Sequence, residues 1–305
     1  MFVSLLSNPS RALAAAMAFT ASLAGCSSTD SDPEGQKTPV QEPEPPKPTL
    51  PAAEGECPAM TQGAQLFRGK NVFLHVPPEG APKGGSLVFY WHGSGSNTGE
   101  CSLVLGPTLK AITDAGGVVA CMDGGQSTND GAYTGPFEWY EGDYNVADEV
   151  VACATEKFEL DPRRIHALGM SAGGLQSSQM VLRRAYMASA VSMSGGCLDC
   201  PEPPDGSNKV PMMLFHGSWE ADLVVIHFYD TSRNMANKLL ERGQLAIDCN
   251  HGGGHRPPSE EAPDMWQFFQ DHPYKVDPEP YTAGLPSSFP AYCSLVTEPL
   301  PLYGQ

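Results

Sequence analysis

Short runs of apolar residues recur along the chain from about Cys57 onward, separated by polar segments. Most of the runs are rich in Val, Leu, Phe and Met and end at turn-forming residues, which is the pattern of buried β-strands. Strands are predicted on this basis at 71–76, 86–91, 118–122, 164–168, 190–193 and 210–215.

Helices are predicted between these strands, where apolar positions recur every three or four residues. In the segment 144–158, Val146, Val150, Val151 and Ala154 fall on one face. The predicted helices are 103–115 (which contains Pro107 and is closed by Gly116 and Gly117), 144–158, 172–184, 232–242 and 263–269.

Strands that alternate with helices indicate an α/β fold, in which a mostly parallel central sheet carries helices on both faces. Ligands in such sheets bind at the carboxyl ends of the strands. The loops that follow Trp91, Leu168 and Phe215 are therefore the expected place for a functional site.

The first 56 residues do not follow this pattern. Arg11 precedes an apolar stretch that ends at Ala24, which is typical of a signal peptide and too short to span a bilayer. The stretch runs into Leu-Ala-Gly-Cys at Cys26, which resembles the lipobox of bacterial lipoproteins and implies lipidation of Cys26. Cleavage near Ala24 without lipidation is the alternative. The prediction is a signal peptide at 1–25, a disordered linker rich in Pro and Glu at 26–56, and one folded domain at 57–305.

Charge and cysteine content restrict the partners and the compartment. The chain has 18 Lys and Arg against 35 Asp and Glu, a net charge of −17, which disfavours nucleic acid as a partner. Eight cysteines remain after Cys26, and an even number in an exported chain predicts up to four disulfides of unknown pairing. Cys197 and Cys200 also fit a redox pair, but they lack a thioredoxin-like βαβ context, so a structural bridge is the favoured interpretation.

The candidate nucleophile is Ser171, in the sequence Gly-Met-Ser-Ala-Gly at 169–173. This segment matches G-x-S-x-G, and it lies between a predicted strand and a predicted helix, as the motif requires. A nucleophilic serine on such a turn is expected to have a strained backbone, with the helix N-terminus directed at the site. A plain glycine turn is the alternative.

The segment Trp-His-Gly-Ser-Gly-Ser, which starts at Trp91, follows another predicted strand. Ester cleavage develops negative charge on the carbonyl oxygen, and backbone N–H groups must already point at it. The N–H groups of Ser94 and Ala172 are predicted to form this oxyanion hole. His92 is expected to be structural, with a role as general base as the weaker alternative.

Two histidines close a glycine-rich loop late in the chain, at His251 and His255. Their spacing would suit a metal site on a helix, but the three glycines between them argue against a helix, so no metal is predicted. His255 is the predicted general base, and His251 is the lesser candidate. A buried acid must orient this base, and Asp222 and Glu220 both follow the strand 210–215.

The order Ser171, acid, His255 is that of the α/β-hydrolases. The stretches HGSGS at His92, DPRRIHALGMSAGG at Asp161 and DCNHGGGH ending at His255 resemble the polyhydroxybutyrate depolymerase/feruloyl esterase group of that fold, over roughly residues 65–272. The resemblance implies a secreted hydrolase of polyesters, or of aromatic or acetyl esters of plant polysaccharides. It also implies Ser171 as nucleophile, His255 as base and Asp222 as acid.

The chain departs from the group at the acid turn, which is two residues longer than the usual H-G-x-x-D-x-x-V. Asp222 keeps the usual spacing to the valines Val224 and Val225, which are expected to pack into the core, whereas Glu220 is expected to bulge toward solvent. No substrate-binding module is evident after His255.

The sequence as a whole predicts an exported, lipid-anchored, monomeric serine esterase that needs no cofactor. Its expected partners are an ester substrate and, through Cys26, a membrane. The aromatic residues of the loop after Asp123 are expected either to wall the acyl site or to pack in the core: Tyr133, Phe137, Trp139, Tyr140 and Tyr144. The alternatives are a peptidase of the same fold and a non-catalytic, glycan-binding surface lipoprotein.

Overall fold

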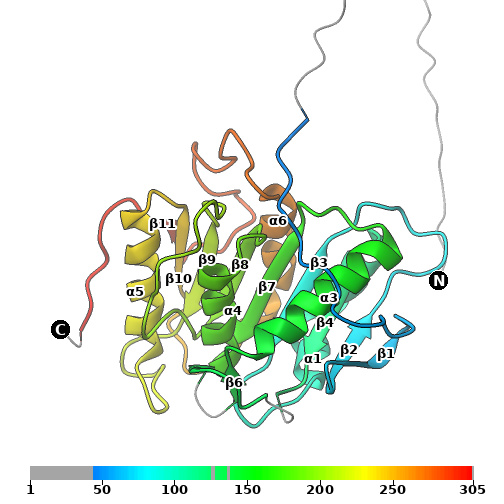
Figure 1. Ribbon diagram of the computed structural model, residues 1–305. Helices are drawn as coiled ribbons and strands as arrows, with labels where there is room; N and C mark the ends of the chain where they lie inside the picture. The colour runs from blue at the N-terminus through cyan, green and yellow to red at the C-terminus, as the bar shows by residue number, and fades with distance from the viewer. Residues whose placement is uncertain (1–43, 125–127, 136–137, 304–305) are drawn as a thin grey trace, which may run out of the picture. The chain divides into compact units, whose positions relative to one another are not determined.

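A nine-stranded mixed sheet forms the centre of the molecule in the computed structural model, which describes residues 44–124, 128–135 and 138–303 (Figure 1). The strand order is β1-β2-β4-β3-β7-β8-β9-β10-β11, and the strands from β4 to β10 in this order are parallel. The bounds are β1 Gly63–Phe67, β2 Lys70–His75, β3 Leu87–Trp91, β4 Val118–Met122, β7 Ile165–Met170, β8 Ser189–Met193, β9 Met212–His216, β10 Ala246–Asn250 and β11 Cys293–Leu295.

Helices cover both faces of the sheet. One hydrophobic cluster joins it to α3 (Asp143–Phe158), α4 (Ala172–Arg183) and α5 (Phe228–Glu241). A second cluster joins the other face to α1 (Gly99–Leu105), α2 (Pro107–Asp114) and α6 (Ala262–Asp271). Strand β3 supplies both, because successive side chains of a strand point to opposite faces: Phe89 and Trp91 belong to the first cluster and Val88 and Tyr90 to the second. The predicted architecture is therefore confirmed.

Two predicted segments differ from the structure. The single helix expected at 103–115 is two helices, because Gly106 adopts φ 48° between α1 and α2, and Pro107 then starts the second helix. The segment expected to be a loop before α3 contains a small antiparallel hairpin, β5 (Tyr133–Gly135) with β6 (Trp139–Tyr140).

Three strands of the sheet are not predicted from the hydrophobic pattern, for physical reasons. The edge strands β1 and β11 are only partly buried, so their side chains do not form an apolar run. Strand β10 is buried, but Asp248 interrupts its apolar run. The contact of its carboxylate with His216 Nε2 at 2.7 Å offsets the cost of burying it.

Four disulfides join cysteines of the described residues: Cys57–Cys153, Cys101–Cys121, Cys197–Cys200 and Cys249–Cys293. Such bonds persist in oxidising compartments, so they fit the predicted export.

Close to Cys57, the backbone N–H groups of Glu54 and Gly55 bind the Glu149 carboxylate on α3. Within the described residues, no helix has the length and hydropathy needed to cross a membrane.

Candidate active site

Ser171 lies on the tight turn between β7 and α4, with backbone angles φ 59° and ψ −121°. A positive φ is unusual for a residue with a side chain, and it projects Ser171 out of the turn. The neighbouring glycines make the turn possible. A Cβ at Gly173 would lie 1.9 Å from the Trp91 carbonyl oxygen, and one at Gly169 would lie 2.2 Å from the Gly173 carbonyl oxygen. Glycine is therefore required at both positions.

His255 connects Ser171 to a buried acid. Its Nε2 lies 2.9 Å from Ser171 Oγ, and its Nδ1 lies 2.7 Å from Asp222 Oδ1. The loop after β10 carries the histidine, and its ring stacks on Phe228 with the ring centroids 4.6 Å apart. In this arrangement Nδ1–H donates to the carboxylate, which leaves Nε2 free to accept the proton of the serine hydroxyl.

Asp222 is fully buried but well supplied with hydrogen bonds. Its Oδ2 accepts from the Ser194 hydroxyl at 2.9 Å and from the Gly217 N–H at 2.8 Å, while Oδ1 faces His255. Burial acts to raise the pKa of Asp222, but these donors outweigh it and hold the pKa below its usual value. Glu220, the alternative acid, is exposed. The hydrogen-bond partner of His255 Nδ1 is Asp222 and not Glu220.

The expected packing of the two valines that follow Asp222 is wrong, however. Val224 and Val225 do not pack into the core: they are 59% and 64% exposed. Asp222 is held instead by its own hydrogen bonds and by the backbone of the turn, where its N–H donates to the Ser218 carbonyl and its carbonyl accepts from the Phe228 N–H.

The other candidate histidines are engaged elsewhere. His92 is buried, with Nδ1 donating to the Gly93 carbonyl and Nε2 accepting from the Gly124 N–H, so its tautomer is determined by turn contacts. His251 Nδ1 accepts from the Gly253 N–H, and burial lowers the pKa of this histidine. Neither is hydrogen-bonded to Ser171.

One group of described residues is close enough to share a metal ion, namely His75, Cys101 and Cys121. The two cysteines form a disulfide and therefore offer no thiolate.

Comparisons with known proteins add to this geometry. No family model matches the sequence, and no curated protein matches it. The native crystal structure of pOPH matches with a TM-score of 0.58 at 16% identity, over 81% of this chain and 98% of that one. A thermostable esterase matches with a TM-score of 0.52 at 20% identity, over 69% of this chain and 62% of that one. A carboxylesterase from Mesorhizobium loti matches with a TM-score of 0.50 at 16% identity, over 68% of this chain and 99% of that one.

The chain has the α/β-hydrolase fold. In an α/β-hydrolase, the turn between the central strand and the following helix is the nucleophile elbow, and the acid and the histidine follow later in the chain. Ser171 lies on the turn between β7 and α4, and Asp222 and His255 follow it along the chain in that order.

The loop after β3 is held by two carboxylates, Glu100 and Glu138, which the sequence does not mark as functional. Glu100 Oε1 accepts from the Gly93 N–H at 3.1 Å and from the Tyr90 hydroxyl at 2.9 Å, and Glu138 Oε2 accepts from the Gly95 N–H at 3.2 Å. Ser94 lies between these two anchored glycines. No local motif marks Glu100, although its place in the first turn of α1 is a common one for an acid.

A pocket of about 220 Å³ opens at Ser171. It is lined by Ser94, Ser171, Ala172, Val224, Val225, Ile226, Phe228 and His255. The described aromatic residues of the loop after Asp123, for which an acyl site and the core were the two expected places, are not among them. Trp139 and Tyr144 are buried against Trp91 in the core, Tyr133 and Tyr140 pack against each other, and Phe137 lies outside the described residues.

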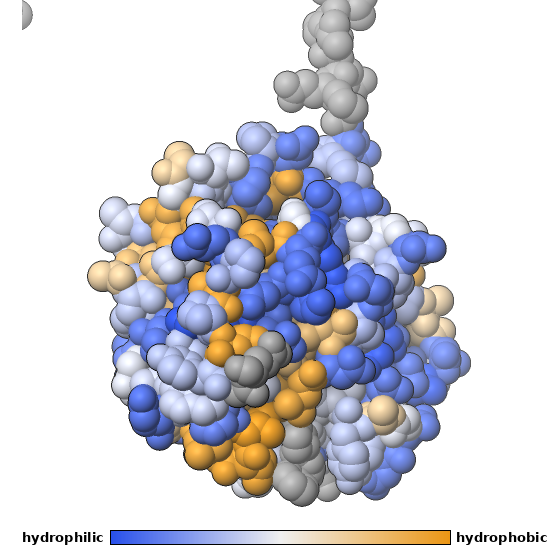
Figure 2. Space-filling view, turned by 90° about the vertical axis from the view of Figure 1, so that its left-hand side faces the viewer, coloured by the Kyte–Doolittle hydropathy of each residue, from blue (hydrophilic) through white to orange (hydrophobic). Residues whose placement is uncertain are grey.

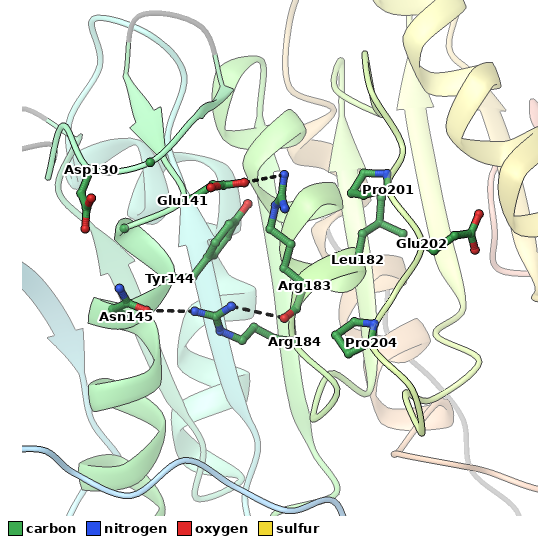
Figure 3. A pocket seen from close by; sticks show the side chains of 12 residues that line it. Asp130, Glu141, Tyr144, Asn145, Leu182, Arg183, Arg184, Pro201, Glu202 and Pro204 are labelled. Atoms are coloured by element: carbon green, nitrogen blue, oxygen red, sulfur yellow. Dashed lines mark hydrogen bonds and ion pairs between the residues drawn. The ribbon is translucent and has the colours of Figure 1, made fainter.

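A larger hollow of about 520 Å³ lies between the start of α3 and the end of α4 (Figure 3). Arg183 pairs there with Glu141 at 2.9 Å, and Arg184 binds the Asn145 side chain at 3.2 Å. No residue of the Ser171 site lines it. The smaller, mainly apolar pocket is therefore the candidate substrate site.

Proposed function

We propose that the protein is an exported serine esterase, a carboxylic-ester hydrolase that works through an acyl-enzyme. The observation that carries this proposal is the unbroken contact from Ser171 Oγ through His255 to Asp222, on a strained turn that opens into a pocket. The thermostable esterase and the Mesorhizobium loti carboxylesterase among the structural neighbours support the same class of activity.

In the proposed mechanism, His255 Nε2 takes the proton of the Ser171 hydroxyl as the oxygen attacks the ester carbonyl. The N–H groups of Ala172 and Ser94 stabilise the negative charge that develops on the carbonyl oxygen. The imidazolium then gives its proton to the departing alcohol, which leaves an acyl group on Ser171. Water, activated by the same histidine, releases the acid. Asp222 keeps the ring oriented and stabilises its cationic form throughout.

The test is Ser171→Ala, with a serine-directed fluorophosphonate as probe. We expect labelling of the wild type at Ser171, and loss of both labelling and ester hydrolysis in a variant that keeps its circular dichroism spectrum. Ser96→Ala is a suitable control, because this serine lies on the neighbouring loop outside the Ser171–His255–Asp222 contact. Labelling at another serine, or full activity of the Ser171 variant, would overturn the proposal.

The substrate class proposed from the family resemblance is a polyester or a feruloyl or acetyl ester. A panel of p-nitrophenyl, feruloyl, acetyl-xylan and hydroxybutyrate esters distinguishes these substrates. A peptidase would instead cleave aminoacyl amides, and a glycan-binding protein would hydrolyse none of them.

We further propose that the mature chain is anchored by lipid at Cys26, which lies outside the described residues, and that it binds no nucleic acid and acts as a monomer. In the native producing cell, mass spectrometry of the N-terminus is expected to show an acylated Cys26. A mature chain with an unmodified Cys26 would refute the anchor without affecting the esterase proposal.

A further inference from the structure

Three consecutive apolar residues stand exposed directly after the proposed catalytic acid. Leu223, Val224 and Val225 are 47%, 59% and 64% exposed. The loop that carries them, between β9 and α5, lies at the lower left in Figure 1. Viewed from that side, hydrophobic surface gathers at the lower edge of the molecule (Figure 2). An exposed apolar cluster of this kind usually marks a binding surface, because water contact with it is unfavourable.

The loop is closed at its base, so the valines are held outward. Leu223 and His227 form an antiparallel bridge, and the Val224 N–H donates to the Ile226 carbonyl at 3.4 Å. The ring of Trp219 stacks on His227, with the centroids 3.6 Å apart.

This apolar surface is continuous with the site. Val224, Val225 and Ile226 line the same pocket as Ser171 and His255. Residues on both sides of the loop contact His255, since Asp222 binds its Nδ1 and Phe228 stacks on its ring. No carboxylate, lysine or arginine lines this pocket within the part of the chain that the structure describes. A charged chain attached to the ester would therefore lose its hydration here without gaining a partner.

We propose that the loop 223–226 is the specificity surface of the enzyme and binds an uncharged aliphatic chain attached to the scissile ester. This inference rests on the proposed esterase function. The chain belongs either to the acyl group or to the alcohol, and the two arms of the experiment distinguish them. Each methylene covered by the loop is expected to raise kcat/KM by roughly fourfold, as burial of an apolar group does.

The first arm measures kcat/KM for p-nitrophenyl acetate, butyrate and octanoate, and the second for acetate esters of methanol, butanol and octanol. We expect the values to rise with chain length in one arm. The double variant Val224→Thr/Val225→Thr keeps the side-chain shape but replaces one methyl group of each valine by a hydroxyl. It should lower the ratio of the longest to the shortest ester in that arm by about tenfold or more.

Leu66→Thr is the matched control, because Leu66 is 59% exposed on the edge strand β1, away from the pocket. This control should keep the wild-type ratio. A flat chain-length dependence in both arms, or an unchanged ratio in the double variant, would overturn the inference while the esterase proposal stands. If the wild type hydrolyses no ester and is not labelled by the fluorophosphonate, both proposals fail.

Discussion

Ser194 donates a hydrogen bond of 2.9 Å to Asp222 Oδ2, the carboxylate oxygen that does not face His255. Ser194 lies just after β8 and has a positive φ of 44°, a backbone conformation rare outside glycine. The turn after one strand thus helps to hold the acid that follows the next one.

Removal of this hydroxyl is predicted to destabilise the protein in a pH-dependent way. Hydrogen bonds hold the pKa of Asp222 below its usual value in the folded protein. They therefore stabilise the fold above the pKa of the unfolded carboxyl, and this contribution is lost as the pH falls through the folded pKa. Ser194→Ala should raise the pKa of Asp222 and cost about 1.5 kcal/mol of unfolding free energy at neutral pH. The deficit should shrink below pH ~4, as shown by urea unfolding at several pH values.

Ser192→Ala is the control for this experiment. Ser192 is also buried, but its hydroxyl binds only the backbone of Gly174 and Gly196. Its loss should cost a similar free energy at every pH. If the deficit of the Ser194 variant is equally independent of pH, the hydroxyl does not stabilise the carboxylate.

Kinetic measurements of variants can distinguish Asp222 from Glu220 as the catalytic acid. Asp222→Asn should lower kcat by about 10⁴-fold, because the amide cannot stabilise the histidine cation. Glu220→Gln should cost less than about tenfold, since this side chain is exposed and lies outside the contact with His255. Both variants are measured on one soluble ester at one pH, with folding checked by circular dichroism. A crippled Glu220 variant beside an active Asp222 variant would reverse the assignment.

Glu100 is predicted to position the loop after β3, which carries Ser94 of the proposed oxyanion hole. Glu100→Ala leaves the Gly93 N–H and the Tyr90 hydroxyl without their acceptor, so kcat should fall by about 10- to 100-fold with little change in KM. Glu100→Gln still offers an amide oxygen to both donors and should restore most of kcat. Equal losses in the two variants would show that the negative charge, rather than the hydrogen bonds, is what matters.

The disulfides should differ in their contribution to stability. Cys57 and Cys153 are 96 residues apart, whereas Cys197 and Cys200 are three apart. Replacing the first pair by serines should lower the free energy of unfolding by about 4 to 5 kcal/mol, and the second by about 2 kcal/mol or less, because a longer closed loop restricts the unfolded chain more. Urea unfolding of the two double variants compares them directly, and a larger loss for the Cys197–Cys200 pair would contradict the expectation.

Much of the fold and the outline of the site followed from the sequence alone. The strand at 118–122 has the predicted bounds, and the α/β order and the helices on both faces follow from local hydrophobic periodicity. The sequence indicates Ser171 as a nucleophile because the motif and the strand-turn-helix context are both local. These features depend on near neighbours in the chain, so a single sequence displays them.

Only the tertiary structure decided which residues meet across the sheet. Ser171 and His255 are 84 residues apart, and Ser194 and Asp222 are 28 apart. The paths of loops likewise determine the disulfide pairing, the hydrogen bond from the Gly93 N–H to Glu100, and the exposure of Val224 and Val225. Apolar composition predicted burial for the two valines, but the bridge between Leu223 and His227 turns this loop outward beside the pocket. Side-chain chemistry states what a residue prefers, whereas the backbone hydrogen bonds of the whole fold determine where it lies.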